Sequence, residues 1–346
     1  MKEDIRHLRE GKLGEWLKAQ GQPRFREKQI LEWIWQRGVV DFEEMSNLPK
    51  SLRESLAADF EIRPIVEDRR QESADGTIKT RFRLFDGHLI ESVLIPVPED
   101  ERFTVCVSSQ VGCSLTCSFC ATGRMDRVRN LDAGEIVDQV RLVNEQCIET
   151  FGRPLTNIVY MGMGEPLLAY KQVMESIDHI TSETGLGMSP RRITVSTAGI
   201  AKMIRKMADD SSRVNLALSL HAADDEKRDS IMPINEHNNL EVLMDAIEYF
   251  YRNTKGRISY EYIAFDGFND SIDDAKNLSR LCTRFPVKVN IIEYNPIGGD
   301  FSMIKSSEDR INNFARYLRD QGIMVTVRRS RGKDIDAACG QLANKE

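Results

Sequence analysis

The chain has 346 residues, of which 41% are hydrophobic and 29% charged, and its net charge is −6. This is enough for one large domain and a smaller one, or for two comparable domains. It contains no run of 18 apolar residues and begins with mixed charge, so we expect no signal peptide and no membrane span. Seven cysteines are sparse for a chain of this length, and an odd number cannot all pair, so a disulfide scaffold is not expected. Free thiols in this number fit a reducing cytoplasm.

The first 60 residues are predicted to be helical. Residues 23–35 place Ile30, Leu31, Ile34 and Trp35 at helical spacing, and residues 48–56 begin another helix. This segment also carries basic and aromatic residues. Both a packing domain and a domain that contacts RNA are therefore compatible with it.

Residues 61–98 change to a β pattern. Two strand-like runs, 80–85 and 89–95, flank Asp86-Gly87, a pair that readily forms a tight turn. We therefore predict a hairpin that links the helical head to the remainder of the chain.

From residue 99 onward, apolar strands alternate with helical stretches. The predicted strands are 103–108, 157–161, 193–196, 214–220, 258–265, 287–293 and 324–328. The predicted helices are 132–149, 170–184, 199–209, 239–253, 271–284 and 306–321. This alternation predicts an α/β fold in which a parallel sheet of about six units forms a barrel or a partial barrel.

Glycine and polar residues gather just after these strands. The segments are 162–166, 197–199, 221–223, 295–296 and 330–332. The carboxyl ends of barrel strands are where such enzymes place their chemistry. We therefore expect the functional site at this end.

Cys113, Cys117 and Cys120 form a C-x3-C-x2-C motif near the same end. Thiolates are the ligands of iron–sulfur clusters, and a four-iron cluster has four irons to coordinate. The next cysteine, Cys147, is 27 residues further on, so three ligands would leave one iron open to chelate a small molecule. Radical S-adenosylmethionine (SAM) enzymes use this arrangement. A zinc site is the alternative, but the five histidines offer no second pair at zinc spacing.

Two further cysteines stand apart from the motif. Cys106 lies seven residues before Cys113, and Cys339 lies among Ala, Gly and Asp residues near the end, in a setting that suits exposure. An exposed thiolate is a good nucleophile toward a sulfonium methyl. Cys147 and Cys282 are expected to be small buried hydrophobes.

Over essentially its whole length the chain resembles the radical SAM rRNA adenine methyltransferases. Within them it resembles the bacterial dual-specificity group that methylates adenine C2. The matching stretches are 106–113, 113–123, 161–166, 219–221, 232–235, 294–296 and 331–341. The resemblance implies a partial TIM-type (β/α)6 radical SAM barrel. The chain would then divide into a helical domain (1–60), a β linker (61–98) and a core with a catalytic C-terminal tail (99–346).

The resemblance also implies the site residues. Cys113, Cys117 and Cys120 would hold one [4Fe–4S] cluster. Cys339 would accept a methyl group, Cys106 would resolve the intermediate, and Glu91 would be the proton acceptor. The positions that match the family's SAM contacts are Gly164, Glu165, Ser196, Ser219, Leu220, His221 and Asn295.

The family's chemistry uses two SAM molecules per turnover. One methylates Cys339, and the second yields a radical that activates this methyl for addition to adenine C2. Attack by Cys106 then releases the product and leaves a disulfide. The implied substrates are 23S rRNA at the peptidyl-transferase centre and tRNA at the adenosine 3′ of the anticodon. The resemblance further implies an electron donor such as flavodoxin, a monomer and a cytoplasmic location.

Three alternatives remain open. A sister family methylates adenine C8 and carries Ala where this chain has Pro166, which favours C2 here. A radical SAM activase that acts on a protein is another possibility, and so is an iron–sulfur protein that binds RNA or senses redox state without turnover. The net charge argues mildly against RNA as a partner, although binding depends on local patches. Basic runs occur, but each of them alone is also compatible with a solvated face, and only their coincidence on one surface would indicate RNA binding. These runs are Arg24/Arg26/Lys28, Arg124/Arg127/Arg129, Arg191/Arg192 and Arg328/Arg329/Arg331/Lys333.

Overall fold

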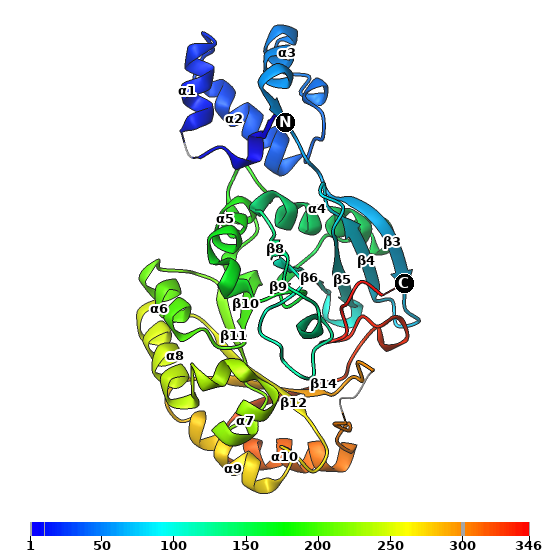
Figure 1. Ribbon diagram of the computed structural model, residues 1–346, viewed down its shortest axis with the longest axis vertical. Coiled ribbons are helices and arrows are strands. Elements are labelled where there is room, and N and C mark those ends of the chain that lie inside the picture. The colour runs from blue at the N-terminus through cyan, green and yellow to red at the C-terminus, as the bar shows by residue number, and fades with distance from the viewer. Residues whose placement is uncertain (1, 10, 299–301, 346) are drawn as a thin grey trace.

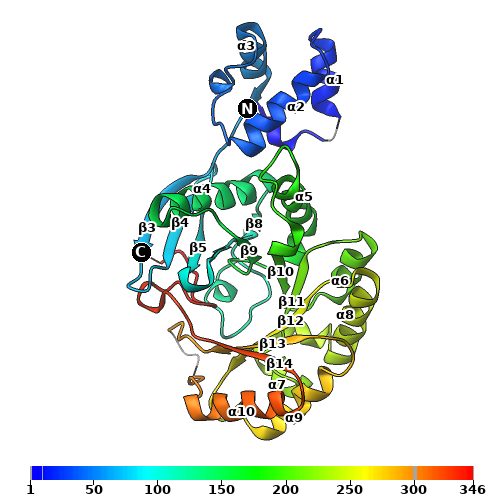
Figure 2. The same ribbon diagram turned by 180° about the vertical axis from the view of Figure 1, so that it is seen from behind.

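The computed structural model describes residues 2–9, 11–298 and 302–345. A small helical head stands at one end of the molecule, and a curved α/β body forms the remainder (Figure 1). The head touches the body on the side of α4 and α5, as the reverse view also shows (Figure 2).

The head consists of α1 (Lys12–Ala19), α2 (Phe25–Leu31) and α3 (Lys50–Asp59). The helix predicted over 23–35 changes after Leu31 into a π-helical turn, Glu32–Gln36. Such wide turns reorient the side chains they carry. Here Trp35 is buried, and its ring stacks on His179 of α5 (Tyr170–Thr181) at 3.6 Å between centroids. The turn therefore contributes to docking the head on the body.

A buried ion-pair network also joins head and body. Arg6 is 6% exposed, and its guanidinium contacts Asp4 at 2.9 Å and Asp138 of α4 (Ala133–Phe151) at 2.8 Å. Beside it, strands β1 (Glu3–Asp4) and β2 (Phe60–Glu61) pair with each other and bring the two ends of the head together. A buried cation with two carboxylate partners is costly to separate from either of them. The head is therefore held by specific contacts as well as by the chain itself.

The body is built on a ten-stranded sheet in the order β14-β13-β12-β11-β10-β9-β6-β5-β4-β3. Its strands are β3 (Val66–Glu72), β4 (Ile78–Arg83), β5 (Leu89–Val97), β6 (Arg102–Cys106), β9 (Asn157–Tyr160), β10 (Ile193–Thr197), β11 (Asn215–Ser219), β12 (Ile258–Ala264), β13 (Lys288–Glu293) and β14 (Met324–Arg328). The strands from β6 to β14 pair in parallel, which confirms the predicted parallel sheet. The sheet curves but stays open, as a partial barrel does (Figure 1).

The strands expected to form a separate β linker are part of this sheet. The predicted hairpin is present as β4 and β5, and β5 pairs antiparallel with β6 from Val93↔Cys106 to Val97↔Arg102. The sheet hydrogen bonds therefore continue from the predicted linker into the predicted core, with no break at the boundary expected at residue 98. The main sheet is mixed, with an antiparallel extension at one edge.

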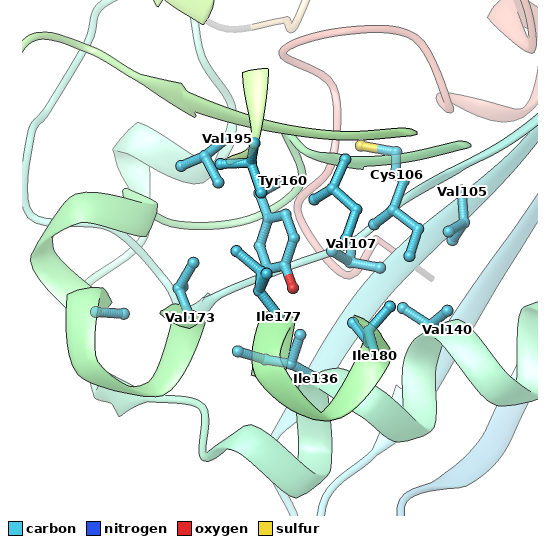
Figure 3. Packing of buried hydrophobic residues seen from close by; sticks show 14 of the residues in the cluster. Val105, Cys106, Val107, Ile136, Val140, Tyr160, Val173, Ile177, Ile180 and Val195 are labelled. Carbon is cyan, nitrogen blue, oxygen red and sulfur yellow. The ribbon is translucent and has the colours of Figure 1, made fainter. Parts of the chain in front are cut away.

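Helices cover the outer face of the parallel strands (Figure 1). They are α4, α5, α6 (Ala201–Asp209), α8 (Leu240–Thr254), α9 (Ile272–Leu281) and α10 (Glu308–Asp320), all in predicted regions. A short helix, α7 (Asp225–Ile231), was not predicted. Tyr160 and Val195 of the sheet pack against Val173 and Ile177 of α5 (Figure 3). None of the helices within the described ranges is long and apolar enough to cross a membrane.

After β14 the chain turns back to the antiparallel strands. This segment, residues 332–345, is called the tail below, and it lies beside β4 and β5 in both views (Figures 1 and 2). The tail begins at Gly332, whose N–H donates to the Asp75 carboxylate at 2.9 Å. It thus connects the last parallel strand to the antiparallel edge of the same sheet.

Candidate functional site

The three-cysteine motif lies in a tight loop between β7 (Gln110–Val111) and β8 (Arg129–Asn130), which pair antiparallel. The Ser118 N–H donates to the Ile231 carbonyl at 3.1 Å, and the Ala121 N–H donates to the Gly340 carbonyl at 2.7 Å. A Cβ at Gly123 would lie 2.8 Å from the Cys117 carbonyl oxygen, too close for any side chain. The backbone therefore holds the loop in a compact fold against both the body and the tail.

This loop forms one side of a pocket at the carboxyl ends of the parallel strands, where the chemistry was predicted. All three cysteines line it. The opposite side comes from the ends of β9 to β14 and from the tail, through residues that include Gly164, Glu165, Ser196, Ser219, His221, Glu261, Arg328 and Cys339. Apolar contacts come from Phe119, Met232, Ile263 and Ile292. The site therefore joins segments from almost the entire length of the body.

The three thiols share one pocket, and thiolates are the ligands that iron–sulfur clusters take. Within the described residues, no three His, Cys, Asp or Glu side chains form a ready-made site for one metal ion. Cys147, the next cysteine along the chain, is fully buried in the core.

Burial also shapes the chemistry of these thiols. It raises the pKa of Cys113 to about 11, and it raises the pKa of Cys117 and Cys120 as well. Free thiols in this setting are protonated at neutral pH, and metal binding releases their protons. The donor set therefore fits an iron–sulfur cluster that assembles as the thiols ionise.

Gly164 and Glu165 lie in the turn after β9. Gly164 has φ 95°, and a Cβ there would lie 2.5 Å from the Cβ of Gln110, so only glycine fits. The two oxygens of Glu165 accept hydrogen bonds from the Ala198 N–H at 2.8 Å and the Leu167 N–H at 3.0 Å. Burial raises the pKa of Glu165 to about 7 despite these bonds. The carboxylate is thus poised to accept a further donor or a positive charge from a ligand.

Ser196, Ser219 and His221 face the same pocket from the ends of β10 and β11. The hydroxyls of Ser196 and Ser219 lie 3.4 Å apart. His221 has φ 55°, and its Nδ1 accepts a hydrogen bond from the Ile263 N–H at 3.1 Å. Burial, together with the charge of Arg228, lowers the pKa of His221 to about 3, so its imidazole is neutral at physiological pH. We call residues 162–166, 197–199 and 219–223 the rim.

Two of the residues predicted to contact SAM lie behind this surface. Leu220 is fully buried and does not line the pocket; its carbonyl accepts a hydrogen bond from Arg228. Asn295 is 5% exposed, and its amide donates to Ser330 Oγ at 2.9 Å and to the Glu293 carbonyl at 3.2 Å. In this structure both residues support the rim and the strand ends from within.

Cys106 and Cys339 approach the site from different elements. Cys106 is buried at the end of β6, and its sulfur points away from Val140 and Ile180 of the covering helices (Figure 3). Cys339 is exposed and lines the pocket, as its sequence setting predicted. Burial raises the pKa of Cys106, and the neighbouring Cys339 raises it further, which places the two thiols near each other. All seven cysteines are free thiols, so the disulfide implied by the resemblance is absent from this state.

The tail that carries Cys339 is packed rather than loose. Ala337, Ala338, Gln341 and Leu342 are all buried around the exposed Cys339. Thr122 Oγ1 donates to the Leu342 carbonyl at 2.6 Å, and Gln341 Nε2 donates to the Pro296 carbonyl at 3.0 Å. These bonds tie the thiol both to the cysteine loop and to the end of β13.

Glu91 anchors the end of the tail. Its side chain is buried on β5, and Oε2 accepts hydrogen bonds from the Ala343 N–H at 2.9 Å and the Asn344 N–H at 3.1 Å. Lys79 Nζ lies 3.5 Å from Oε1. Glu91 does not line the pocket in this arrangement. The predicted proton acceptor is therefore covered by the segment that carries the reactive cysteine.

The predicted basic runs differ in how their charges are paired. The last run is largely neutralised: Arg329 and Lys333 contact the buried Glu293 at 2.6 and 2.8 Å, and Arg331 contacts Glu99 at 3.3 Å. Burial alone would raise the pKa of Glu293, but these cations lower it to about 2. By contrast, Arg124 and Arg127 bond only neutral oxygens within the described part of the chain. They are the freer charges beside the cysteine loop.

Two buried charged residues near the pocket were missed by the sequence analysis. Glu261 lines the pocket floor from β12, held by Ser259 and Asn290 and 3.6 Å from Arg328. Arg228 of α7 is completely buried behind the rim. Arg228 lies in the run Asp224–Arg228, which resembles a solvated helix face. Its one signal is the spacing to the apolar Ile231, three residues further on and one helical turn away.

Comparison with known families gives two matches. Residues 4–62 match the ribosomal RNA large subunit methyltransferase N-terminal domain. Residues 107–278 match the radical SAM superfamily. The first match spans the helical head, and the second spans the cysteine loop and most of the parallel strands.

Individual relatives match along the whole chain. A probable dual-specificity RNA methyltransferase RlmN from Cytophaga hutchinsonii is 53% identical over 345 residues, which cover 100% of this chain and 94% of that protein. A dual-specificity RNA methyltransferase RlmN from Campylobacter hominis is 45% identical and covers 96% and 94%. The crystal structure of a radical SAM methyltransferase from Sphaerobacter thermophilus is 43% identical, with a TM-score of 0.92 and coverage of 99% and 100%.

Proposed function

Since this chain belongs to the RlmN family of dual-specificity RNA methyltransferases, with a radical SAM fold, we propose that it methylates C2 of adenosine in 23S rRNA and in tRNA. The expected positions are the peptidyl-transferase centre of the rRNA and the adenosine 3′ of the tRNA anticodon. An enzyme with these substrates would act in the cytoplasm. The chain has the two features that such a reaction needs: a cysteine loop for a cluster and two further thiols beside it.

The observation that carries the proposal is that Cys339 lines the same pocket as the three-cysteine loop, while Cys106, at the end of β6, is near enough for Cys339 to raise its pKa. Ring carbon C2 of adenine is electron-poor, so direct transfer of a methyl cation from SAM would not reach it. A carrier thiol removes this obstacle, because a sulfur-bound methyl is delivered as a carbon radical instead. A protein that only binds RNA would have no need for these two thiols, and one that only senses redox state would have no need for a rim that matches SAM contacts.

The cofactor assignment follows the fit of the donor set. A [4Fe–4S] cluster bound by Cys113, Cys117 and Cys120, together with SAM, would supply the reductive cleavage that starts radical chemistry. Gly164, Glu165, Ser219 and His221 of the rim, together with Ser196 of β10, would hold SAM. Leu220 and Asn295 would act through the backbone and strand ends that they support. We propose two SAM molecules per turnover, a low-potential donor such as flavodoxin, and a monomeric enzyme.

The protein's own thiols would carry the methyl group in sequence. The Cys339 thiolate first attacks the methyl carbon of SAM, displaces S-adenosylhomocysteine and becomes a methyl thioether. After radical addition, the RNA is joined to the protein through the carbon on Cys339 sulfur. The Cys106 thiolate then attacks that sulfur, the sulfur–carbon bond breaks, and the carbon keeps the electron pair and takes up a proton to become the C2 methyl group. A Cys106–Cys339 disulfide remains. Two external electrons reduce this disulfide for the next turnover.

Glu91 would take the C2 proton between these steps. In the present arrangement its Oε2 is occupied by the Ala343 and Asn344 N–H groups. Proton transfer requires the acceptor to be within hydrogen-bond reach of the donor. The end of the tail must therefore leave Glu91 once Cys339 engages the RNA.

A trapping experiment tests the proposal. Cys106→Ala enzyme, produced in cells and purified under denaturing conditions, should carry RNA joined to Cys339, visible as a nuclease-sensitive shift on a gel. Cys106→Ala/Cys339→Ala should carry none. Cys282→Ala is the matched control, since Cys282 is a partly buried thiol packed against the core, and it should behave as wild type.

The product identifies the reaction. Mass spectrometry of RNA from cells with the wild-type enzyme should show 2-methyladenosine that is missing when the gene is deleted. An 8-methyladenosine product would instead place the enzyme with the C8 family. Release of methylated RNA by Cys106→Ala without any adduct would contradict the resolving role of Cys106.

A further inference from the structure

Arg228 is a completely buried cation behind the rim. Its guanidinium donates to three backbone carbonyls: Ala198 at 2.5 Å, Leu220 at 3.1 Å and Ser219 at 3.3 Å. Its fourth bond goes to Asn235 Oδ1 at 2.5 Å. Ala198 follows β10, while Ser219 and Leu220 end β11. One side chain thus fastens together two neighbouring segments of the rim.

The positive charge of Arg228 has no direct counter-ion in the described ranges. All four acceptors are neutral, although buried arginines ordinarily pair with carboxylates. The nearby carboxylates of Asp225 and Asp229 are held by Asn235 Nδ2, at 2.9 and 2.6 Å, instead of by the guanidinium. Burial lowers the pKa of Arg228 to about 10, so the group is still charged at neutral pH. The helix that carries Arg228 also contacts the cysteine loop: its last residue, Ile231, accepts the Ser118 N–H at 3.1 Å and belongs to the apolar cluster against which Cys117 packs. Arg228 accordingly acts on the pKa of Cys117, which it lowers.

A purely structural explanation must be weighed first. Arg228 would then only link α7 to the sheet through hydrogen bonds. Such a link needs no net charge, and a buried charge without a counter-ion destabilises a protein. A neutral side chain or a paired arginine would serve such a role better. The unpaired charge instead lies beside one of the three proposed cluster ligands, where negative charge accumulates when the cluster is bound.

We propose that Arg228 is a positioning residue with two roles: its fork of N–H groups fixes the rim that binds SAM, and its charge stabilises the reduced cluster. Three thiolates and a four-iron core together are negatively charged, and reduction adds one more electron. A fixed cation in a low-dielectric surrounding stabilises the more negative form. The electron itself comes from the external low-potential donor. Loss of the charge therefore makes reduction harder, while loss of the fork loosens SAM binding.

This inference rests on the proposed function only through the cluster at Cys113, Cys117 and Cys120. It requires neither RNA nor methyl transfer. Wild-type protein that binds no cluster would overturn the proposed function itself. A cluster that is present and insensitive to Arg228 would overturn only this inference.

Two substitutions separate the roles. Arg228→Gln removes charge and fork, whereas Arg228→Lys keeps the charge and loses the fork. Both are reconstituted anaerobically and compared with Lys227→Gln, which removes an adjacent cation that pairs with Asp274 instead of facing the rim. Cluster reduction is followed by electron paramagnetic resonance during a redox titration with dithionite. SAM binding is measured by calorimetry on the oxidised cluster.

In Arg228→Gln, reduction should become at least tenfold less favourable, which is a shift of about 59 mV for one electron. Arg228→Lys should keep most of the wild-type potential. Both variants should bind SAM at least tenfold more weakly, because each leaves the rim carbonyls without their bidentate partner. Lys227→Gln should change neither quantity. An unchanged potential in Arg228→Gln would overturn the electrostatic role, and unchanged SAM affinity in both variants would overturn the positioning role.

A second variant covers the case in which Arg228→Gln does not fold. Asn235→Ala keeps the arginine but removes the acceptor of its Nη1. SAM affinity should fall while the cluster potential stays as in wild type. A potential lowered by about 59 mV or more would count against a fixed charge at Cys117. An unaltered SAM affinity would count against the positioning of the rim by the guanidinium.

Discussion

The two sides of the pocket are built in different ways. The rim is fixed from behind by buried side chains: Glu165 bridges two backbone turns, and Arg228 bonds three carbonyls. The tail opposite it is held mainly by two side chains: Glu91 accepts hydrogen bonds from two tail N–H groups, and Thr122 donates to a tail carbonyl. The tail can therefore move when only a few hydrogen bonds break. The cofactor side is therefore fixed more firmly than the side that carries Cys339, which a few broken contacts would release.

The largest effect should come from the cysteine loop, on the rigid side. Cys117→Ala removes one of three ligands in a loop that offers no spare thiol, so the reconstituted protein should lose its cluster and its brown chromophore. Iron analysis and visible spectroscopy measure this directly. Cys147→Ala, in the core, should retain full iron content. A Cys117→Ala protein with wild-type iron would show that the cluster has another ligand.

The next effect tests whether the tail is releasable. Glu91→Ala removes the acceptor of two tail N–H groups, so the tail should detach while the rim and cluster stay intact. Trypsin cleavage after Arg331 or Lys333, mapped by mass spectrometry, should become roughly tenfold faster, because proteolysis follows the population of the open form. Glu99→Ala, which removes the exposed partner of Arg331, is the control. Equal cleavage in both variants would mean that Glu91 does not hold the tail.

A smaller effect should appear in the pH dependence of the cluster-free protein. The pKa of Glu165 is raised from an ordinary value of 4.5 to about 7, so the folded form keeps a proton that the unfolded form loses. Stability should therefore fall as pH rises from 4.5 to 7 and level off above 7, by about 1–3 kcal/mol from this group. Glu165→Gln should lack this component. Urea unfolding at each pH gives the difference, and parallel curves for the two proteins would contradict the assignment.

The smallest effect concerns one bond between loop and tail. Thr122→Val keeps the shape but removes the donor to the Leu342 carbonyl, and we expect about 1 kcal/mol of destabilisation. Ser118→Ala is the comparison, since it removes a weaker bond from the loop to Ile231 on the rigid side. Chemical denaturation measures both. Tail proteolysis should rise in Thr122→Val alone.

Much of this architecture could be predicted from the sequence, because it depends on local patterns. Alternating apolar strands and helices gave the parallel sheet, and the spacing of Cys113, Cys117 and Cys120 gave the cluster loop. The exposure of Cys339 followed from its small and polar neighbours. Each of these features is encoded within a short stretch of chain.

The rest depends on contacts between distant residues. The packing of the tail could not be predicted, because Glu91 and Ala343 are 252 residues apart. The pairing of Glu293 with Arg329 and Lys333, which turns a basic run into a neutral surface, is hidden for the same reason. Arg228 was missed because a charged run on a short helix ordinarily faces solvent. Burial of a charge is a property of the whole fold and leaves little trace in the local sequence.

The contacts that fix the tail also limit the distance over which the Cys339 thiol can move. Cys339 lies four positions before Ala343, which Glu91 holds, and seven positions after Gly332, where the tail is fixed to Asp75. At roughly 3.5 Å per extended residue, the thiol can stray about 14 Å from the first anchor and about 25 Å from the second. Glu91 at Ala343, together with the bonds from Thr122, Ala121 and Gln341 described above, keeps Cys339 near the cysteine loop. When these contacts open, we expect the longer span to Gly332 to let Cys339, the proposed methyl carrier, follow a bulky RNA, and residues inserted between Cys339 and Ala343 to remove this difference in reach.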